Sequence, residues 1–322
     1  MKKNILIESD DAAKIATSYL IDEKLVALKT ETVYGISCDP GSPSAIKKLY
    51  KLKKRPKNNP LIIHVNSINL AEKICMISRD AKLVMEKFWP GPLTLILPKR
   101  KSFLIHKDAL SNLDTIAVRY PISKIMNKIL KKLKRPLAAP SANISGGVSA
   151  TDAGHVIDSF GEDIDLVIDS GRSDFGLEST ILDMTTSQYK IRRMGVIDHL
   201  TIIEVLGKNI NSNEKECINL EKPNSPGQLL KHYSPSTPLR INIVNPKSGD
   251  AFLNFGNKII INHKPSLNLS KSSNLNEAAY NLFHFLRKLD KLKKKRIVVA
   301  PIPNIGIGKT INERLRRASI YE

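Results

Sequence analysis

Residues 25–35 read Leu-Val-Ala-Leu-Lys-Thr-Glu-Thr-Val-Tyr-Gly, and this stretch decides the fold class. The four apolar residues at 25–28 predict a buried strand, because a short apolar run bounded by polar residues is typical of a strand covered on both faces. They follow a segment ending near Ile21 that Ser9 or Asp10 can cap as a helix. A helix followed by a buried strand is the repeating unit of an α/β sheet, so the sequence predicts that class.

The same alternation continues to about residue 206. Strands are expected at residues 61–65, 93–97, 115–119, 137–139, 166–169, 179–183 and 190–193, and helices at 44–52, 68–76, 79–88, 122–133 and 151–158. So many short strands interleaved with helices predict a large twisted mixed sheet with flanking helices.

Apolar periodicity stops at residues 207–238, where Pro and Gly accumulate, and we interpret this segment as a linker. Beyond it, strands are expected at 239–244, 258–261 and 296–300, and helices at 273–289 and 310–318. The sequence therefore predicts three parts: a large domain at 1–206, the linker, and a small α/β domain at 239–322.

The amino-acid composition excludes several classes of protein. The chain has 322 residues, of which 41% are hydrophobic and 25% charged, as in globular proteins. No stretch approaches the roughly 18 apolar residues of a membrane span, and Glu8 comes too early for a signal peptide, so we expect a cytoplasmic protein without a membrane contact. The cysteines Cys38, Cys75 and Cys217 lie far apart, which argues against a disulfide framework or a structural zinc site.

Positive charge is concentrated in one region. The chain has 51 Lys and Arg against 31 Asp and Glu, a formal net charge of +20. Residues 51–150 hold 20 basic and 5 acidic side chains, whereas residues 151–200 hold 4 and 10. Such an excess indicates polyanionic partners, namely phosphates, nucleotides or nucleic acid, and its sign does not choose among them. For the basic run at 287–296 a solvated helix end is an equal alternative.

Two loops carry candidate binding groups. The loop at 29–35 directly follows the first strand, where ligands of α/β sheets collect, and Thr30 and Thr32 offer hydroxyl groups there. Lys53 and Arg55 alternate, so in an extended segment both side chains would project to one side and hold one phosphate chain.

Two glycine-containing segments are weaker signals. Residues 140–151 lie between a strand and a helix and offer small polar groups to an anion. The Gly-Ile-Gly-Lys-Thr sequence at 306–310 suggests a P-loop, but Pro303 stands where the first glycine of that motif belongs. We therefore disfavour a P-loop at this position.

The chain lacks the sequence motifs of a protein nucleophile, such as G-x-S-x-G or a Cys/His pair. His64 on a buried strand is by itself more typical of a core than of a metal site. The residues favour phosphate handling without a covalent enzyme intermediate.

Together these segments resemble a known family. T-E-T-V-Y-G, K-x-R-P-x-x-N-P-L-I-x-H-V, W-P-G-P-L-T-L-I-L, P-S-A-N-x-S-G, L-E-S-T-I and R-x-G-x-I occur in this order. Over about residues 10–200 the chain resembles the threonylcarbamoyl-AMP synthase family with its YrdC-like domain. The Ser-Pro-Gly at 225–227, the His-Tyr-Ser-Pro at 232–235 and the small domain beyond are similar to the longer, two-domain branch.

The resemblance implies an activity. Family members condense L-threonine, bicarbonate and ATP, with Mg²⁺, into threonylcarbamoyl-AMP and pyrophosphate. The product supplies the threonylcarbamoyl group of threonylcarbamoyladenosine in tRNA, through downstream transfer machinery. This reaction requires positioning and charge neutralisation, which is what the residues above can supply.

The resemblance also implies roles for particular residues. Those expected to take part in catalysis are Lys53, Arg55, Ser141 and Asn143. Those expected to bind ATP are Arg55, Asn59, Thr115, Asn143, Ser149, Thr151, Arg193 and Tyr233, the last as a lid. Those expected to bind threonine are Thr32, His64, Arg119, Ser141 and Ser179. No protein ligand to a metal is expected.

The chain departs from the family pattern at two positions. Lys29 replaces the usual proline before T-E-T-V-Y-G, and Lys54 replaces the usual glycine of K-G-R-P. Two alternatives stay open: an RNA-binding module of the same fold, in which the basic surface contacts tRNA or double-stranded RNA, and a paralogue that acts on a different acyl or carbamoyl substrate.

Overall fold

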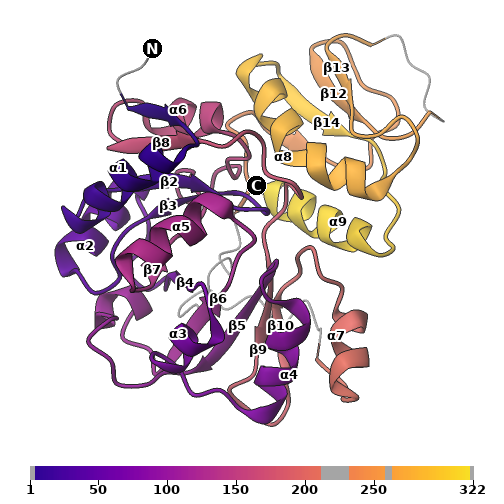
Figure 1. Ribbon diagram of the computed structural model, residues 1–322. Coiled ribbons are helices and arrows are strands. Elements are labelled where there is room, and N and C mark those ends of the chain that lie inside the picture. Colours follow the sequence, from indigo (N-terminus) through magenta and orange to yellow (C-terminus); the bar gives the residue numbers. More distant parts are fainter. Residues whose placement is uncertain (1–3, 212–231, 258–262, 320–322) are drawn as a thin grey trace.

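The computed structural model describes residues 4–211, 232–257 and 263–319. Figure 1 shows two parts side by side, the first running from indigo to pink and the second from orange to yellow. Within the described residues, no helix is long and apolar enough to span a membrane.

The first part contains two mixed sheets. Their strand orders are β1-β8-β2-β3 and β10-β9-β5-β6-β4-β7. The strands are β1 (Ile5–Ile7), β2 (Val26–Lys29), β3 (Tyr34–Ser37), β4 (Ile62–His64), β5 (Leu93–Pro98), β6 (Thr115–Arg119), β7 (Leu137–Ala138), β8 (Leu166–Asp169), β9 (Thr180–Asp183) and β10 (Lys190–Arg193). Backbone hydrogen bonds between Cys38 and Ala138 join β3 to β7, so the two sheets form a continuous layer. The predicted large mixed sheet with flanking helices is confirmed, with this internal division.

The helices of the first part follow the predicted ranges approximately, except that α7 and a 3-10 turn were not predicted. They are α1 (Asp10–Ile21), α2 (Pro43–Lys53), α3 (Ile68–Glu72), α4 (Arg79–Phe88), a 3-10 turn (Lys107–Leu110), α5 (Lys124–Leu133), α6 (Ala153–Phe160) and α7 (His199–Leu206). Ser9, rather than Asp10, caps α1, and Ser42 and Ser123 cap α2 and α5 in the same way. Each serine oxygen accepts an otherwise unpaired N–H of the first helical turn.

Two strands of the first part, β1 and β3, were not predicted. Residues 29–35 were expected to form a loop, but they are the turn of an antiparallel hairpin in which Lys29 pairs with Tyr34. Gly35 makes β3 hard to recognise from the sequence, because glycine is depleted in strands. It is suited to this position because a Cβ there would lie 3.3 Å from both the Ala139 Cβ and the Pro140 carbonyl oxygen.

The second part is the expected small α/β unit. Its parallel sheet has the order β11-β14-β12-β13. The elements are β11 (Leu239–Arg240), β12 (Asp250–Asn254), β13 (Ser266–Asn268), α8 (Leu275–Lys291), β14 (Arg296–Val299) and α9 (Ile307–Ala318). The strand predicted at 258–261 lies outside the described residues, and β12 and β13 were not predicted. The basic run at 287–296 covers the end of α8, a turn and the start of β14.

The two parts share a buried core. The core of the second part is built around Phe252 and Phe283, and it includes Val33, Val148 and Leu177 from the first part. Figure 1 shows α8 and α9 on the side of the small sheet that faces the first part. The predicted domain boundaries stay predictions, since most of the linker lies outside the described residues.

Candidate active site

A pocket lies where several strands of the first part end. The β2–β3 turn, the ends of β4, β6 and β10, the start of β9 and the segment after β7 all reach it. Its lining residues are Thr30, Thr32, Val33, Tyr34, Gly35, Arg55, Ile62, His64, Arg119, Ala139, Pro140, Ser141, Glu178, Ser179, Arg193 and His232. The structure therefore brings together seven of the predicted site residues, namely Thr32, Arg55, His64, Arg119, Ser141, Ser179 and Arg193.

The hairpin turn presents ordered hydroxyl groups to the pocket. The Thr30 hydroxyl donates to the carbonyl oxygen of Val33 at 2.6 Å and lies 2.8 Å from the Thr32 hydroxyl. The Thr32 oxygen also accepts from Nη1 of Arg119 at 2.9 Å. These contacts hold Thr32 against the guanidinium group on the neighbouring strand end.

Arg119 has a carboxylate partner that the sequence analysis did not identify. Its Nη2 lies 2.7 Å from Oε1 of Glu31, and both side chains are buried. This ion pair lacks hydrogen-bond geometry, and among the described residues Nη2 and both oxygens of Glu31 have no hydrogen-bond partner. Buried polar groups of this kind are costly unless they find a partner.

His64 is a neutral imidazole in this environment. It is buried on β4, directly opposite Arg119 in the strand register. Burial, and then the nearby Arg119 charge, lower the pKa of His64 to about 3. At neutral pH it can exchange hydrogen bonds with a ligand but adds no positive charge.

Arg193 reaches the pocket from β10. Its Nη2 donates to the Ser179 hydroxyl at 2.9 Å, and its Nε donates to the Ser179 carbonyl oxygen at 3.0 Å. The Ser179 hydroxyl also lies 2.8 Å from that of Thr94 on β5. Ser179 and Arg193 therefore form one fixed unit on the wall of the pocket.

Arg55 is held by the loop that follows it. Its Nη2 donates to the Asn59 side-chain oxygen and to the Pro60 carbonyl oxygen, both at 2.7 Å. Asn59 is buried and does not line the pocket, so it orients Arg55 from behind. Burial lowers the pKa of Arg55 to about 10, which leaves it a cation at neutral pH.

Lys53 does not share an extended segment with Arg55, and that expectation was wrong. Lys53 is the last residue of α2, and Lys54 ends the helix in the left-handed conformation with φ of 50°. The Lys53 ammonium is buried and donates to the carbonyl oxygens of Ser141 and Asn143, each at 2.5 Å. Burial, and then Arg55, lower its pKa well below the usual value. Lys53 therefore holds the 141–143 segment in place from outside the pocket lining.

The segment after β7 contributes mainly through support. Ser141 lines the pocket, whereas Asn143 is buried and donates to the carbonyl oxygens of Ile144 and Gly147. Ser149 donates to Oε1 of Glu178 at 2.6 Å. Thr151 is buried beside His155, away from the pocket lining.

Two further predicted residues lie outside the pocket lining. Thr115 is at the start of β6, and the five-residue strand separates it from Arg119 by about 13 Å. Tyr233 is fully buried and stacks on Phe283 with ring centroids 5.5 Å apart. The adjacent residue, His232, lines the pocket in its place.

The second part reaches the pocket through a buried ion pair. Arg314 on α9 is fully buried, and its Nε lies 3.1 Å from Oε2 of Glu178. Burial raises the pKa of Glu178, but Arg314, Arg193 and the Ser149 hydrogen bond outweigh it, so the pKa lies below its usual value. The L-E-S-T-I segment contained Glu178, whereas nothing in the sequence pointed to Arg314.

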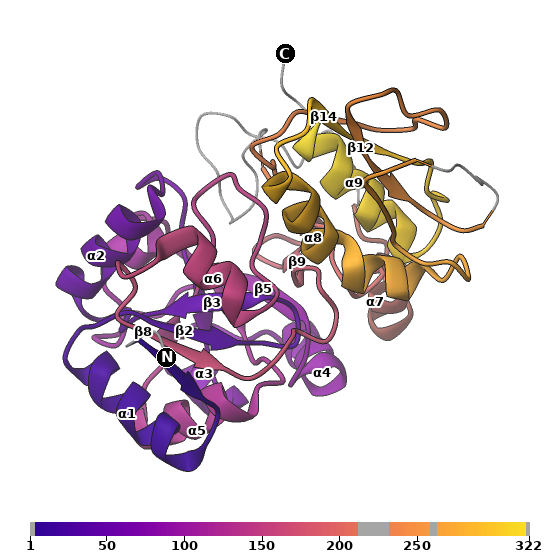
Figure 2. The same ribbon diagram turned by 90° about the horizontal axis from the view of Figure 1, so that it is seen from above.

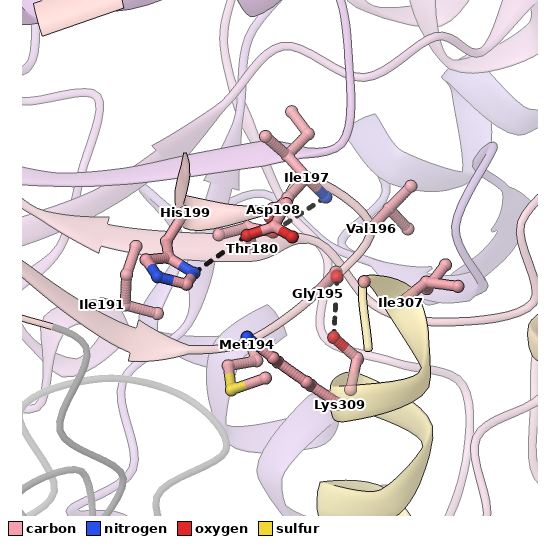
Figure 3. Close-up of a pocket in the computed structure, with 12 residues that line it drawn as sticks. Thr180, Ile191, Met194, Gly195, Val196, Ile197, Asp198, His199, Ile307 and Lys309 are labelled. Carbon is pink, nitrogen blue, oxygen red and sulfur yellow. Dashed lines mark hydrogen bonds and ion pairs between the residues drawn. The ribbon is translucent and has the colours of Figure 1, made fainter. Parts of the chain in front are cut away.

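The Gly-Lys-Thr sequence at the start of α9 forms a different kind of contact. Figure 3 shows Ile307 and Lys309 beside residues 194–199, where α9 abuts the first part. The hydroxyl of Thr310, which a P-loop would offer to a metal, donates to the Gly195 carbonyl oxygen at 3.0 Å. Gly308 is required by packing, since a Cβ there would overlap the Pro303 carbonyl oxygen. This geometry agrees with the rejection of a P-loop.

The pocket does not provide a ligand set of its own for Mg²⁺. Among its lining residues the one carboxylate is Glu178, and both of its oxygens are engaged by Arg314 and Ser149. Mg²⁺ prefers several oxygen ligands, commonly including substrate phosphates. The donor set fits Mg²⁺ that arrives on a phosphate chain, and does not fit a cage made by the protein.

Fold and site together define a class. The chain is a two-part α/β protein whose pocket combines three guanidinium groups, two neutral imidazoles and several hydroxyl groups, as a site for anionic small molecules does.

Comparison with known proteins identifies the family. The Telomere recombination family matches residues 18–195, and the C-terminal domain family of threonylcarbamoyl-AMP synthase matches residues 197–319. The threonylcarbamoyl-AMP synthase of Pyrococcus abyssi is 34% identical over 96% of this chain and 94% of its own length. That of Bacillus subtilis is 32% identical over 98% of this chain and 94% of its own length. This chain belongs to the threonylcarbamoyl-AMP synthase family.

A solved structure agrees with this assignment. The crystal structure of P. abyssi Sua5 complexed with L-threonine has a TM-score of 0.89 and 32% sequence identity to this chain, covering 99% of this chain and 97% of that one. The shared architecture extends over both parts of the molecule, and the YrdC-like fold prediction is confirmed.

Proposed function

We propose that this protein is an L-threonylcarbamoyladenylate synthase. It condenses L-threonine, bicarbonate and ATP to threonylcarbamoyl-AMP and pyrophosphate for threonylcarbamoyladenosine modification of tRNA. The observation that carries the proposal is the pocket in which Arg55, Arg119 and Arg193 converge, in a chain of this family. As a reaction class this is nucleotidyl transfer, since the carbamate takes the adenylyl group of ATP.

Arg119 is suited to the threonine carboxylate. It has unused donor capacity at Nη2, and Thr32, His64 and Ser179 surround it with neutral hydrogen-bonding groups. A guanidinium group can bind a carboxylate through two parallel hydrogen bonds. Glu31 pairs with Arg119 from outside the pocket lining and holds the guanidinium group in place.

Arg55 and Arg193 are suited to the phosphates of ATP. The oxygen of a carbamate on the threonine nitrogen attacks the α-phosphorus, and the bond to pyrophosphate breaks. Negative charge on the phosphate oxygens must be held during this exchange, and fixed cations in a buried pocket hold it strongly. Asn59 and Ser179 keep the two guanidinium groups oriented. Mg²⁺ is proposed to enter on the phosphates.

Four residues affect the reaction chiefly because they shape the pocket wall: Lys53, Ser141, Asn143 and Ser149. The Lys53 ammonium fixes the carbonyl groups of the 141–143 segment, and Ser149 orients Glu178. The ATP roles inferred for Thr115, Thr151 and Tyr233 would require contacts beyond this pocket lining. His232, which lines the pocket, would help to exclude water from the labile adenylate.

The remaining assignments extend beyond the pocket. We place the reaction in the cytoplasm, with the product passed to separate transfer machinery. Contact with RNA is a second candidate function, favoured by a groove beside the pocket that is lined by Lys47, Lys51, Arg55 and Lys57. Replacing both Lys47 and Lys51 with Glu should weaken tRNA binding and should make that binding depend less on salt concentration. Adenylate formation should stay intact.

The first experiment is a direct assay. The purified protein is incubated with ATP, Mg²⁺, bicarbonate and L-threonine, and threonylcarbamoyl-AMP is measured by mass spectrometry. Omission of bicarbonate and replacement of threonine by serine are the controls. A protein that binds ATP but forms no adenylate would point to a paralogue with another substrate.

Arg55→Ala tests the phosphate role. We expect the rate of adenylate formation to fall at least 100-fold, about 2.7 kcal/mol of lost transition-state stabilisation. Arg79→Ala is the matched control, because Arg79 is an exposed arginine at the start of α4. Near-normal turnover of Arg55→Ala would remove Arg55 from the proposed mechanism.

A further inference from the structure

We propose that Asp152, His155 and His284 form a binding site for a divalent transition-metal ion such as Zn²⁺. The site joins the two parts of the molecule. It is distinct from the pocket described above, because none of its three side chains lines that pocket. The proposal does not depend on the proposed function.

The three residues come from two helices that pack across the junction. Asp152 caps the N-terminus of α6, His155 lies in the first turn of α6, and His284 lies on α8. Figure 2 shows α6 beside α8, and the two imidazole rings have centroids 5.2 Å apart. Only folding of the whole chain brings these side chains together.

Two of the three distances between the ligand atoms match those around a tetrahedral ion. Oδ2 of Asp152 lies 3.3 Å from Nε2 of His155 and 3.2 Å from Nδ1 of His284. One ligand atom from each residue lies within 4.8 Å of the other two. For Zn²⁺ with bonds of about 2.0–2.1 Å, tetrahedral geometry places ligand atoms about 3.3 Å apart. The contacts are also longer than charge-assisted hydrogen bonds, which are about 2.7–2.9 Å.

The chemistry of the donors selects the kind of ion. Two imidazole nitrogens and one carboxylate oxygen are a ligand set of Zn²⁺ and neighbouring transition metals, which leave a fourth position for water. Mg²⁺ and Ca²⁺ prefer oxygen ligands and are not expected to bind here. Among the described residues, no other group of three His, Cys, Asp or Glu ligand atoms is this close together.

In the metal-free protein the ligand atoms take part in local hydrogen bonds that a metal ion would replace, including the one between Nδ1 of His284 and Oδ2 of Asp152. Oδ1 of Asp152 accepts the backbone N–H of His155 at 2.9 Å, so Oδ2 is directed to the imidazoles. In the metal-free protein the Thr151 N–H donates to Nδ1 of His155, which places the proton on Nε2. Metal binding at Nε2 requires the proton on Nδ1, where the Thr151 hydroxyl 3.3 Å away can accept it, and it costs the hydrogen bond from the Thr151 N–H.

Arg287 is the nearest opposing charge. Its guanidinium group donates to the carbonyl oxygens of Val148 and His155 and to the Ser159 hydroxyl, and not to a ligand atom of the cluster. Its charge lowers the affinity for a cation but does not occupy the site. A bound ion would join α8 to the start of α6, where Asp152 lies three residues after Ser149, the partner of Glu178.

The test is metal binding by the full-length protein. After treatment with a chelator, the protein is titrated with Zn²⁺ by calorimetry and with Co²⁺ by visible absorption, which reports tetrahedral coordination. We expect one ion per chain, intense tetrahedral Co²⁺ bands, and a melting temperature that rises with Zn²⁺ but not with Mg²⁺.

Two variants and a control complete the test. His284→Ala should weaken Zn²⁺ binding at least tenfold and abolish the Co²⁺ bands. Asp152→Asn keeps the helix cap, since asparagine also caps helices, and should weaken Zn²⁺ binding similarly. His199→Ala, which removes a histidine paired with Asp198 elsewhere, should bind as the unmodified protein does. Absence of Zn²⁺ binding, or binding unchanged in His284→Ala, would overturn the site.

Discussion

Lys54 shows how one residue can depart from a family pattern and keep the fold. It ends α2 in the left-handed conformation, with φ of 50°, and its backbone N–H still closes the last turn. Glycine adopts this conformation without strain, whereas a side chain costs about 1–2 kcal/mol there. The glycine usual at this position of the family therefore has a backbone reason.

Lys54→Gly should stabilise the protein. We expect the free energy of unfolding to rise by about 0.5–1 kcal/mol, because relief of backbone strain exceeds the entropy that glycine adds to the unfolded chain. Urea unfolding gives this difference. Lys57→Gly is the control, since Lys57 is exposed and has no left-handed backbone, and it should be neutral or destabilising. A loss of stability in Lys54→Gly would contradict the strain argument.

At the scale of elements, the segment at 232–234 packs between the two parts and contacts both. Backbone bonding of Ser234 to Gly146 fixes it on the first part, and the Tyr233 ring stacks on Phe283 of α8. The Arg314 guanidinium lies 4.6 Å from the centroid of that ring. The Tyr233 hydroxyl is buried and has no hydrogen-bond partner in the part of the chain that the structure describes. The aromatic ring, and not the hydroxyl, is therefore the stabilising group.

Tyr233→Phe and Tyr233→Ala should separate these contributions. Removal of the unpaired hydroxyl should be neutral or slightly stabilising. Removal of the ring should lower the free energy of unfolding by about 3–5 kcal/mol, because it opens a cavity between Phe283 and Arg314. Thermal and urea unfolding of both variants measure this. Strong destabilisation by Tyr233→Phe would show that the hydroxyl has a partner essential to the fold.

At the scale of the whole molecule, a buried ion pair links the two parts. Arg314 from α9 meets Glu178 beside the pocket, and Val33, Val148 and Leu177 of the first part enter the core of the second. The second part therefore supports one side of the pocket, through the contact of Arg314 with Glu178. Its packing determines the protonation of Glu178.

This pair predicts how stability depends on pH. The pKa of Glu178 in the folded protein lies below its unfolded value, so its contribution is present above about pH 4.5 and is lost as pH falls through the folded pKa. Glu178→Gln should cost about 2 kcal/mol at pH 7, because it removes the buried carboxylate that faces Nε of Arg314, while Arg314 keeps its contacts with Glu313 and the Met194 carbonyl oxygen. The cost should shrink below pH 4.5. Urea unfolding across this range tests it, with Glu204→Gln on the exposed face of α7 as control. A cost that does not change with pH would contradict the assignment.

Much of the site was predictable because its residues lie in short motifs at strand ends. Thr32, His64 and Arg119 follow strands that the apolar pattern located, and chain direction then carries their side chains to one edge. Lys53 was placed wrongly because a helix end, and not an extended segment, precedes Arg55. The local pattern at Lys53 did not reveal that its ammonium would be buried among carbonyl groups.

The sequence by itself determined the α/β class, the cap of the first helix, most strands and the family, since these depend on local periodicity and on motifs read within a few residues. Only the tertiary structure decided which distant groups meet. Glu178 and Arg314 are 136 residues apart, and Asp152 and His284 are 132 apart. Such contacts arise when buried charges and polar groups find partners as the two parts pack, and no local pattern encodes that choice.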